Sequence, residues 1–238
     1  MTAQVKLGDM HVDVVLKDIK NIHLSVHPPA GRVRISAPAR MKLDAIRVFA
    51  ISKLGWIREQ QRRLRSQERE TRREYLPAES HYVWGRRHLL RVTEGAEHQS
   101  VVLTPRRLHL LVPGEAGTTK RETILDAWYR QQVKTAAVAI VAKWEPIVRV
   151  NVQRIFVQRM KTRWGSCNQT AGNIRLNTEL AKKPLECLEY IVVHEMLHLL
   201  EPTHNARFIA LLDKALPQWP VSRRRLNELP VRHEDWAY

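Results

Sequence analysis

The sequence has no long apolar run and only two cysteines among its 238 residues, and these absences exclude several classes of protein. No stretch approaches the roughly 18 consecutive apolar residues that a membrane-spanning helix requires. The first residues, MTAQVKLGDMHVDVV, are polar and acidic where a secretory signal peptide has its apolar segment. Cys167 and Cys187 are too few for a disulfide scaffold and do not form a C-x-x-C pair. We therefore expect a cytoplasmic protein without a membrane anchor or a disulfide framework.

Positive charge, by contrast, is abundant. The chain has 40 Lys and Arg against 24 Asp and Glu, a formal net charge of +16, and 44% of its residues are hydrophobic. That apolar content excludes a disordered basic tail, because such tails cannot bury a core. The basic excess favours nucleic acid or an acidic protein as a partner. Residues 58–73 alone contain seven Arg and three Glu. This segment is either a solvated helix end with i,i+4 ion pairs or a nucleic-acid or partner-protein surface.

The hydrophobic pattern predicts an α+β fold with two regions, because segments of alternating apolar residues are interspersed with segments of helical period. Residues 1–118 form a β-rich N-terminal region with a long basic helix at about 44–74, and the turn-forming segment PGEAGTT marks its end. Strands are expected there at 12–16, 22–26, 33–35, 81–92, 100–104 and 107–112. Residues 119–238 form the second region, with helices expected at about 119–143, 184–200, 205–216 and 222–229 and strands at 152–159 and 172–177.

The strongest functional signal is YIVVHEMLHLLEPTHNARF at 190–208. His194 and His198 are four residues apart, so one helical turn places both imidazoles on the same face, with Glu195 beside them. His204 follows Pro202, which makes a continued regular helix unfavourable and allows the chain to turn back. Three protein ligands leave a fourth position for water, as in catalytic zinc sites. The motif with a third histidine at one fixed spacing arises by chance in about one such sequence in 600, which favours a metal site over unrelated histidines.

The identity of the third ligand stays open at this point. His204 is the main candidate, and Cys167 is its strongest competitor because thiolates also bind zinc. Carboxylates supply weaker alternatives, namely Glu201, Asp213 and Glu228.

The chain resembles the YgjP-like metallopeptidase domain family, which comprises zincins related in motif to SprT-like proteins. The resemblance depends on two blocks, KTRWGSCNQTAGNIRLNTEL at 161–180 and PLECLEYIVVHEMLHLLEPTHNARF at 184–208. The segment VRISAP at 33–38 extends it weakly towards the N-terminus. The chain departs from metzincins, which share the six-residue step to the third histidine, because Glu201 stands where they have glycine.

The resemblance implies a zincin-like catalytic domain over 119–238, with one Zn²⁺ ion held on a helix. His194, His198 and His204 would be the zinc ligands, and Glu195 the general base. Gly172–Asn177 would form the edge strand against which an extended substrate lies. The implied substrate-binding residues are Trp164, Gly165, Ser166, Cys167, Asn173 and Arg175. Trp164 is equally well explained as a core aromatic residue, and Cys167 as a packed thiol.

We therefore expect a zinc-dependent metallopeptidase in which Glu195 activates a water molecule that attacks a peptide bond. The alternative is a nucleic-acid-associated protein whose zinc site has secondary, latent or lost peptidase activity. A metal-binding scaffold without catalysis is a third interpretation. The group that stabilises the oxyanion stays open among Arg163, Arg175 and Arg207.

Overall fold

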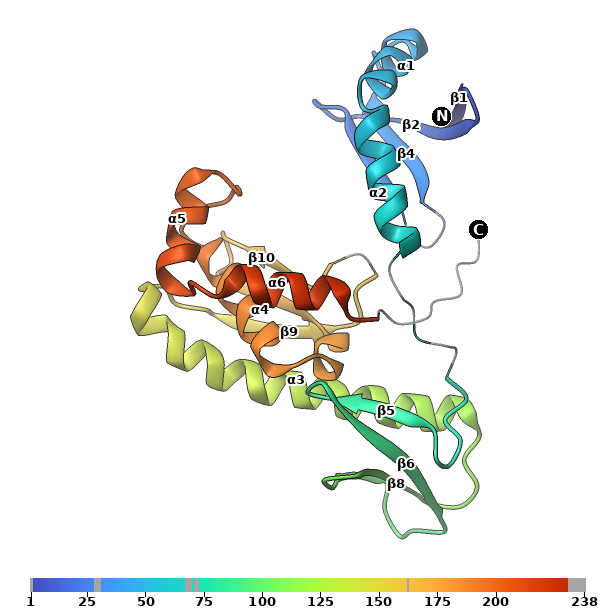
Figure 1. Cartoon of the computed structure of the whole chain (residues 1–238), viewed down its shortest axis with the longest axis vertical. Coiled ribbons are helices and arrows are strands. Elements are labelled where there is room, and N and C mark those ends of the chain that lie inside the picture. Colours follow the sequence, from blue (N-terminus) through green and yellow to red (C-terminus); the bar gives the residue numbers. More distant parts are fainter. Residues whose placement is uncertain (1, 28–30, 67–69, 71–72, 162, 231–238) are drawn as a thin grey trace. The chain divides into compact units, whose positions relative to one another are not determined.

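The structure is a computed structural model that describes every residue except 1, 28–30, 67–69, 71–72, 162 and 231–238 (Figure 1). The chain divides after Glu70 into two compact units, which are described separately. Each unit combines sheet and helix, so the predicted α+β class is confirmed. Within the described residues, no helix is both long and apolar enough to cross a membrane.

The first unit is a four-stranded sheet packed against two helices. The strands have the order β1-β2-β4-β3, with β2 and β4 parallel and the other pairs antiparallel. Their bounds are β1 (Thr2–Leu7), β2 (Met10–Lys17), β3 (His23–His27) and β4 (Arg32–Pro38), and the helices are α1 (Leu43–Ser52) and α2 (Leu54–Ser66). Strand β1 is not among the predicted strands, whereas the other three are confirmed.

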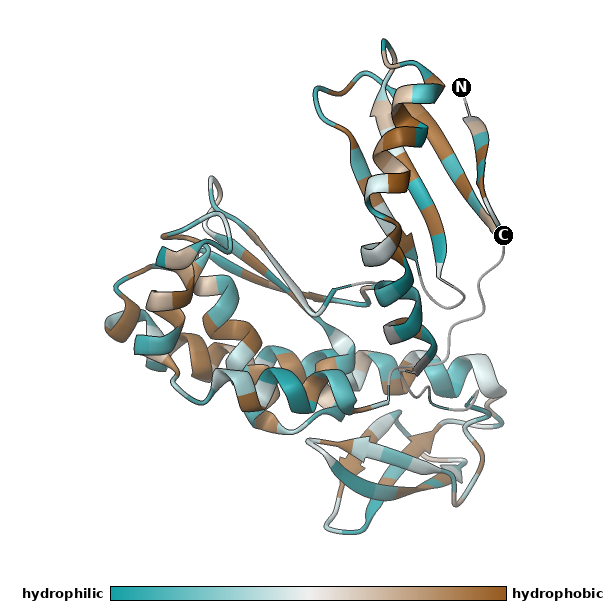
Figure 2. Ribbon diagram, turned by 45° about the horizontal axis from the view of Figure 1, so that its top comes forward, coloured by the Kyte–Doolittle hydropathy of each residue, from teal (hydrophilic) through white to brown (hydrophobic). Residues whose placement is uncertain are grey.

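The core of the first unit follows from alternation along its strands. Val12 and Val14 of β2 and Ile35 of β4 are fully buried, and they belong to one cluster with Ile46 of α1 and Ile57 of α2. Figure 2 shows the corresponding alternation of apolar and polar residues along these strands. Apolar burial of this kind contributes about 25 cal/mol for each Å² removed from water.

The long helix predicted at about 44–74 is wrong in its extent. The structure has two helices, separated at Lys53, whose φ and ψ of −106° and 6° are not helical. The amide of Lys53 donates to the carbonyl of Ala50, three residues earlier, so the helical ladder tightens and ends there. Gly55, a poor helix former, follows closely. Helix α2 ends at Ser66, and residues 67–69 and 71–72 of the prediction lie outside the described residues.

The second unit contains two sheets and a long helix, α3 (Thr118–Val148). One sheet has the order β5-β6-β8-β7, and the other has the order β10-β11-β9. The bounds of the first sheet are β5 (Ser80–Val83), β6 (Arg86–Glu94), β7 (Ser100–Leu103) and β8 (Arg107–Val112). Those of the second are β9 (Arg154–Gln158), β10 (Gly165–Asn168) and β11 (Asn173–Asn177). The 3₁₀ helix η1 (Thr178–Lys182) leads to α4 (Leu185–Leu197), α5 (Ala206–Ala215) and α6 (Trp219–Glu228).

One core connects both sheets of the second unit. Leu90 and Leu108 of the first sheet, Leu125 of α3 and Leu176 of β11 are buried members of the same apolar cluster. The sequence places a boundary at 118–119, whereas the compact units divide after Glu70. PGEAGTT at 113–119 is a turn inside the second unit, because the strands before it pack on the helix that follows it.

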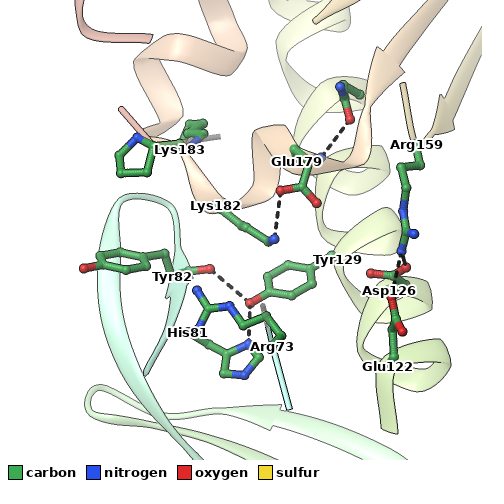
Figure 3. Close-up of polar contacts among 12 residues, drawn as sticks. Arg73, His81, Tyr82, Glu122, Asp126, Tyr129, Arg159, Glu179, Lys182 and Lys183 are labelled. Atoms are coloured by element: carbon green, nitrogen blue, oxygen red, sulfur yellow. Dashed lines mark hydrogen bonds and ion pairs between the residues drawn. The ribbon is translucent and has the colours of Figure 1, made fainter. Parts of the chain in front are cut away.

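A buried polar cluster, consisting of His81, Tyr129, Glu179 and Lys182, lies where β5, α3 and η1 meet (Figure 3). The Tyr129 hydroxyl donates to the carbonyl of Tyr82 at 3.1 Å and lies 3.4 Å from His81 Nδ1. Lys182 Nζ is 2.8 Å from Glu179 Oε2. Buried polar groups require such partners, so the cluster fixes how the first sheet docks on η1.

The turn between β5 and β6 contacts the segment that leads into α4. The amides of Trp84 and Gly85 donate to the carbonyls of Ala181 and Lys182 at 2.8 and 3.3 Å. Gly85 has a φ of +77°, and an added Cβ would lie 2.8 Å from Cγ of Pro184. Glycine is required at this turn because the backbone conformation is left-handed and the space is taken. The turn thereby anchors the residue that opens α4.

Candidate metal centre

Helix α4 carries His194, Glu195 and, at its C-terminal cap, His198. Most residues of α4 before His194 are buried, including Leu188 and Val192, so packing against the core fixes the helix axis. His194 and His198 lie one turn apart, and their ring centres are 4.9 Å from each other. The helix predicted at 184–200 is confirmed, and it ends at Leu197.

His204 returns to the helix end through a short turn. The amides of Leu200 and Glu201 both donate to the carbonyl of Leu197, which closes the last turn of α4. The carboxylate of Glu201 accepts from the amide and hydroxyl of Thr203 at 3.4 and 3.2 Å. Helix α5 starts directly after Asn205, whose side chain caps it. This turn places His204 opposite His194 and His198, as the spacing predicts.

The three histidine rings direct their Nε2 atoms at one another. His204 Nε2 lies 2.9 Å from His194 Nε2 and 3.2 Å from His198 Nε2. A tetrahedral site with zinc–nitrogen bonds of about 2.0–2.1 Å separates its nitrogens by about 3.3 Å. Among the described residues, this triad is the one group of three or more His, Cys, Asp and Glu side chains close enough to share a metal ion.

Hydrogen bonding and burial keep these nitrogens available as ligands. His198 Nδ1 lies 3.0 Å from the carbonyl of Glu201, so Nδ1 carries the proton and the lone pair is on Nε2. Burial, then the neighbouring rings of His198 and His204 and the charge of Arg223, lower the pKa of His194 to about 3. Burial also lowers the pKa of His204. Neutral imidazoles are the form that binds a metal, so the donor set fits one ion.

Phe208 forms the floor beneath the triad. Its ring centre is 4.9, 4.6 and 4.9 Å from those of His194, His198 and His204, and its side chain is fully buried. Asn205 Oδ1 accepts from the amide of Phe208 at 3.0 Å, which fixes the first turn of α5. The N-x-x-F spacing therefore combines a helix cap with an aromatic support. Phe208 is not among the site residues that the sequence predicts.

Glu195 points at β10 and is 5% exposed. A Cβ added to Gly165 would lie 2.6 Å from Glu195 Oε1 and 3.0 Å from its Cδ, so only glycine leaves room for this carboxyl group. Burial raises the pKa of Glu195 to about 8, and the charge of Arg163 opposes the shift. A bound cation would also oppose it, because positive charge favours the carboxylate.

An open cleft of about 700 Å³ runs from the triad along β10. Of the predicted substrate-binding residues, it brings together Gly165, Ser166, Cys167 and Arg175. Trp164 lies outside the lining, partly buried against the core, with Lys183 Nζ 5.8 Å from its ring centre. Asn173 also lies outside the lining. The cleft adds residues that the sequence did not single out for it, namely Asn168, Gln169, Thr170 and Pro202.

The expected edge strand requires a correction. Gly172–Asn177 corresponds to β11, which pairs antiparallel with β10 and parallel with β9, so it is the central strand of the sheet. The neighbouring strand β10, Gly165–Asn168, is not among the predicted strands. Within the described residues β10 pairs with β11 alone, so its other edge is open beside the cleft. The error arose because four residues with glycine and serine carry little strand signal.

The structure also bears on two choices that the sequence leaves open, namely the third ligand and the residue that stabilises the oxyanion. Cys167 lines the cleft, but it is not a member of the triad whose side chains are close enough to share an ion, and burial and Glu195 raise the pKa of its thiol to about 11. Arg163 and Arg175 line the cleft, whereas Arg207 does not. Arg207 lies on α5 within 4.0 Å of the carboxylate of Glu201.

Comparison with known proteins links the site to a family. The family described as "YgjP-like, metallopeptidase domain" matches residues 20–229, which include the triad and the cleft. A search of curated proteins finds no match. Among solved structures, the metallopeptidase zymogen of Pyrococcus abyssi abylysin is similar at 19% identity and a TM-score of 0.36, covering 38% of this chain and 90% of that one.

Proposed function

The chain belongs to the YgjP-like metallopeptidase domain family, and we propose that it is a zinc-dependent peptidase in which Glu195 is the general base. Its substrates are peptides or proteins, as for a metallopeptidase in general. The observation that carries the assignment is the convergence of three histidine Nε2 atoms beside a buried carboxyl group.

His194, His198 and His204 would hold the ion through these Nε2 atoms. The histidine-rich donor set suits zinc, which accepts three imidazoles and keeps one open position in catalytic sites. When bound, zinc polarises the scissile carbonyl and lowers the pKa of the attacking water.

Glu195 moves the protons. Its side chain lies beside the triad and is held in place by β10, so it can reach a water molecule in the cleft. The carboxylate accepts a proton as the water attacks the carbonyl carbon and delivers it to the amine as the carbon–nitrogen bond breaks. A cation held by the triad would favour the carboxylate form of Glu195, which is the form that accepts the proton.

The open edge of β10 would bind the substrate. An extended peptide can add to a free strand edge through backbone hydrogen bonds, which fixes its register without regard to sequence. Gly165 and Cys167 face Glu195, so a peptide along this edge lies over the triad.

The test compares Glu195→Gln and His198→Ala with the wild-type protein and with His98→Ala, which changes an exposed histidine outside the cleft. We expect wild type, Glu195→Gln and His98→Ala to bind one zinc ion per chain, and His198→Ala to lose it. Cleavage of a proteome-derived peptide library should fall at least about 1,000-fold in Glu195→Gln and in His198→Ala. Full activity of Glu195→Gln would refute the assignment.

A second candidate function is binding of nucleic acid by the first unit. Arg58, Arg62 and Arg65 lie on one side of α2 and, with Asp9 and Met10, line a groove of about 530 Å³. All three arginines are exposed, and no aromatic residue lines the groove, so phosphate contacts rather than base stacking would supply the affinity. Steep loss of duplex DNA binding with salt, and its loss in the triple Arg→Gln variant, would support this function. No binding at low salt would exclude it.

A further inference from the structure

The cleft beside the triad has an unbalanced charge. Its lining contains two arginines, Arg163 and Arg175, whereas Glu195 is its one acidic side chain among the described residues. The carboxyl group of Glu195 is buried against Gly165, so it does not balance the charges of the more exposed Arg163 and Arg175. A cation held by the triad would add to the same sign.

The side chain of Arg175 packs against an aromatic ring, and it forms no side-chain hydrogen bond with the residues that the structure describes. It stands in the middle of β11, opposite Ser166 on β10 and Phe156 on β9. Its Cζ lies 5.4 Å from the centre of the Phe156 ring, a cation–π contact that occupies the face of the guanidinium group. The five N–H groups point outward in the plane of the guanidinium and suit a carboxylate.

Arg163 lines the same cleft and precedes β10 in the chain, next to Trp164 on its N-terminal side. Its carbonyl accepts from Asn177 Nδ2 at 2.8 Å, so the backbone at the start of β10 is tied to the N-cap of η1. Its side chain is exposed and lines the cleft.

Neither cleft arginine forms an ion pair with a carboxylate in the described part of the chain. Other arginines of the second unit do: Arg121 pairs with Glu94 at 2.9 Å, and Arg225 pairs with Glu186. The charges of Arg163 and Arg175 are therefore available to a bound molecule. Exposed charges are screened by water and salt, so each contributes modestly, and two that line one cleft contribute more.

We propose that Arg163 and Arg175 make this cleft select peptides with acidic side chains beside the scissile bond. The inference deepens the proposed peptidase function. A peptide on the free edge of β10 would lie about 4.8 Å from β10 and about 9.6 Å from β11. Ser166 is the small residue that separates it from Arg175, so a Glu or Asp side chain on that face meets the guanidinium above Ser166. Side chains near the start of β10 meet Arg163.

Binding is the first test, because it does not depend on turnover. Zinc-loaded Glu195→Gln protein is titrated with a fluorescent octapeptide of alternating Thr and Glu, and with its counterpart of alternating Thr and Gln. We expect the acidic peptide to bind about tenfold more tightly at low salt. The added substitutions Arg163→Gln and Arg175→Gln together should bring the ratio close to 1. Arg154→Gln, which changes an exposed arginine of β9 outside the cleft, should leave it unchanged.

Turnover is the second test. Cleavage sites in a proteome-derived library should be enriched in Asp and Glu for wild type, and the double arginine variant should lose the enrichment. Matched Asp and Asn peptides should differ mainly in KM.

Equal binding of acidic and amide peptides, or a preference that survives the double substitution, would overturn the inference. An equal fall in kcat for every peptide would also overturn it, because it would mean that the arginines stabilise the oxyanion. Selective binding without any cleavage would support the inference and refute the peptidase function.

Discussion

The second unit holds histidines in two contrasting environments. His81 lies in the buried polar cluster and is 2% exposed, whereas the triad of His194, His198 and His204 borders an open cleft. Burial is the largest cause of the lowered pKa in both places, to about 4 for His81 and about 3 for His194. A lowered pKa therefore does not distinguish a structural histidine from a metal ligand.

The partners of each ring make the distinction. His81 lies near a hydroxyl group and a carboxylate, with Tyr129 Oη at 3.4 Å and Glu79 Oε1 at 3.5 Å. Each Nε2 of the triad instead faces another Nε2. Nitrogens with lone pairs repel one another unless a proton or a cation lies between them, so convergence indicates a metal site. In the buried polar cluster, Tyr129 and Lys182 find oxygen partners within the chain. His81 Nε2 faces the Glu79 carboxylate at 3.5 Å instead of another imidazole.

Of the substitutions that separate the cleft from the buried polar cluster without removing a triad histidine or Glu195, Gly165→Ala should have the largest effect, because it alters the cleft and leaves the cluster untouched. The added Cβ would lie 2.6 Å from Glu195 Oε1, and the buried carboxyl group must move. We expect kcat to fall about 100-fold, because a displacement near 1 Å costs about that much, while zinc stays bound. Gly117→Ala is the matched control, since its Cβ meets nothing within 4 Å. Activity of Gly165→Ala equal to that of the control would contradict the positioning of Glu195 by β10.

His81→Gln alters the buried polar cluster and leaves the triad intact. His81 has a pKa of about 4 in the native state and about 6.5 in the unfolded chain. Between these values the unfolded state binds a proton that the native state does not, so stability is full above pH 6.5 and falls as the pH drops towards 4. Between pH 7 and pH 4.5 we expect wild type to lose about 2–3 kcal/mol more than the variant in urea denaturation of metal-free protein. An identical pH dependence, or a loss of zinc from the variant at pH 7, would be inconsistent with a purely structural His81.

Asn205→Ala should have the smallest effect. The substitution removes the cap of α5 and costs about 1 kcal/mol in the free energy of unfolding. Because His204 precedes the cap and Phe208 depends on it, we also expect zinc affinity to fall several-fold, which competition with a fluorescent chelator would measure. Unchanged zinc affinity at the reduced stability would mean that the cap supports the helix and not the triad.

The sequence predicted the helix of the metal site well, because its signals are local. The i,i+4 spacing of His194 and His198, the break at Pro202 and the buried apolar face of α4 are each visible within one or two turns. Three of the four strands of the first unit, β2, β3 and β4, were equally visible, since period-two alternation marks a half-buried sheet.

What the sequence did not predict depends on contacts between distant segments. The edge position of β10 follows from its pairing with β11. Its four residues have low strand propensity, so the local sequence does not predict a strand there. The requirement for glycine at 165 arises from Glu195, thirty residues later, and the role of Phe208 from three rings on other segments. The division after Glu70 depends on a core shared by both sheets of the second unit.

The most direct test of the metal centre is X-ray absorption spectroscopy at the zinc edge of the zinc-loaded protein. The account predicts nitrogen or oxygen neighbours at about 2.0–2.1 Å, outer-shell scattering from three imidazoles and no sulfur. A sulfur neighbour at about 2.3 Å would place Cys167 or Cys187 in the ligand set, and scattering from fewer than three imidazoles would remove a member of the triad. Either result would contradict a centre built from His194, His198 and His204.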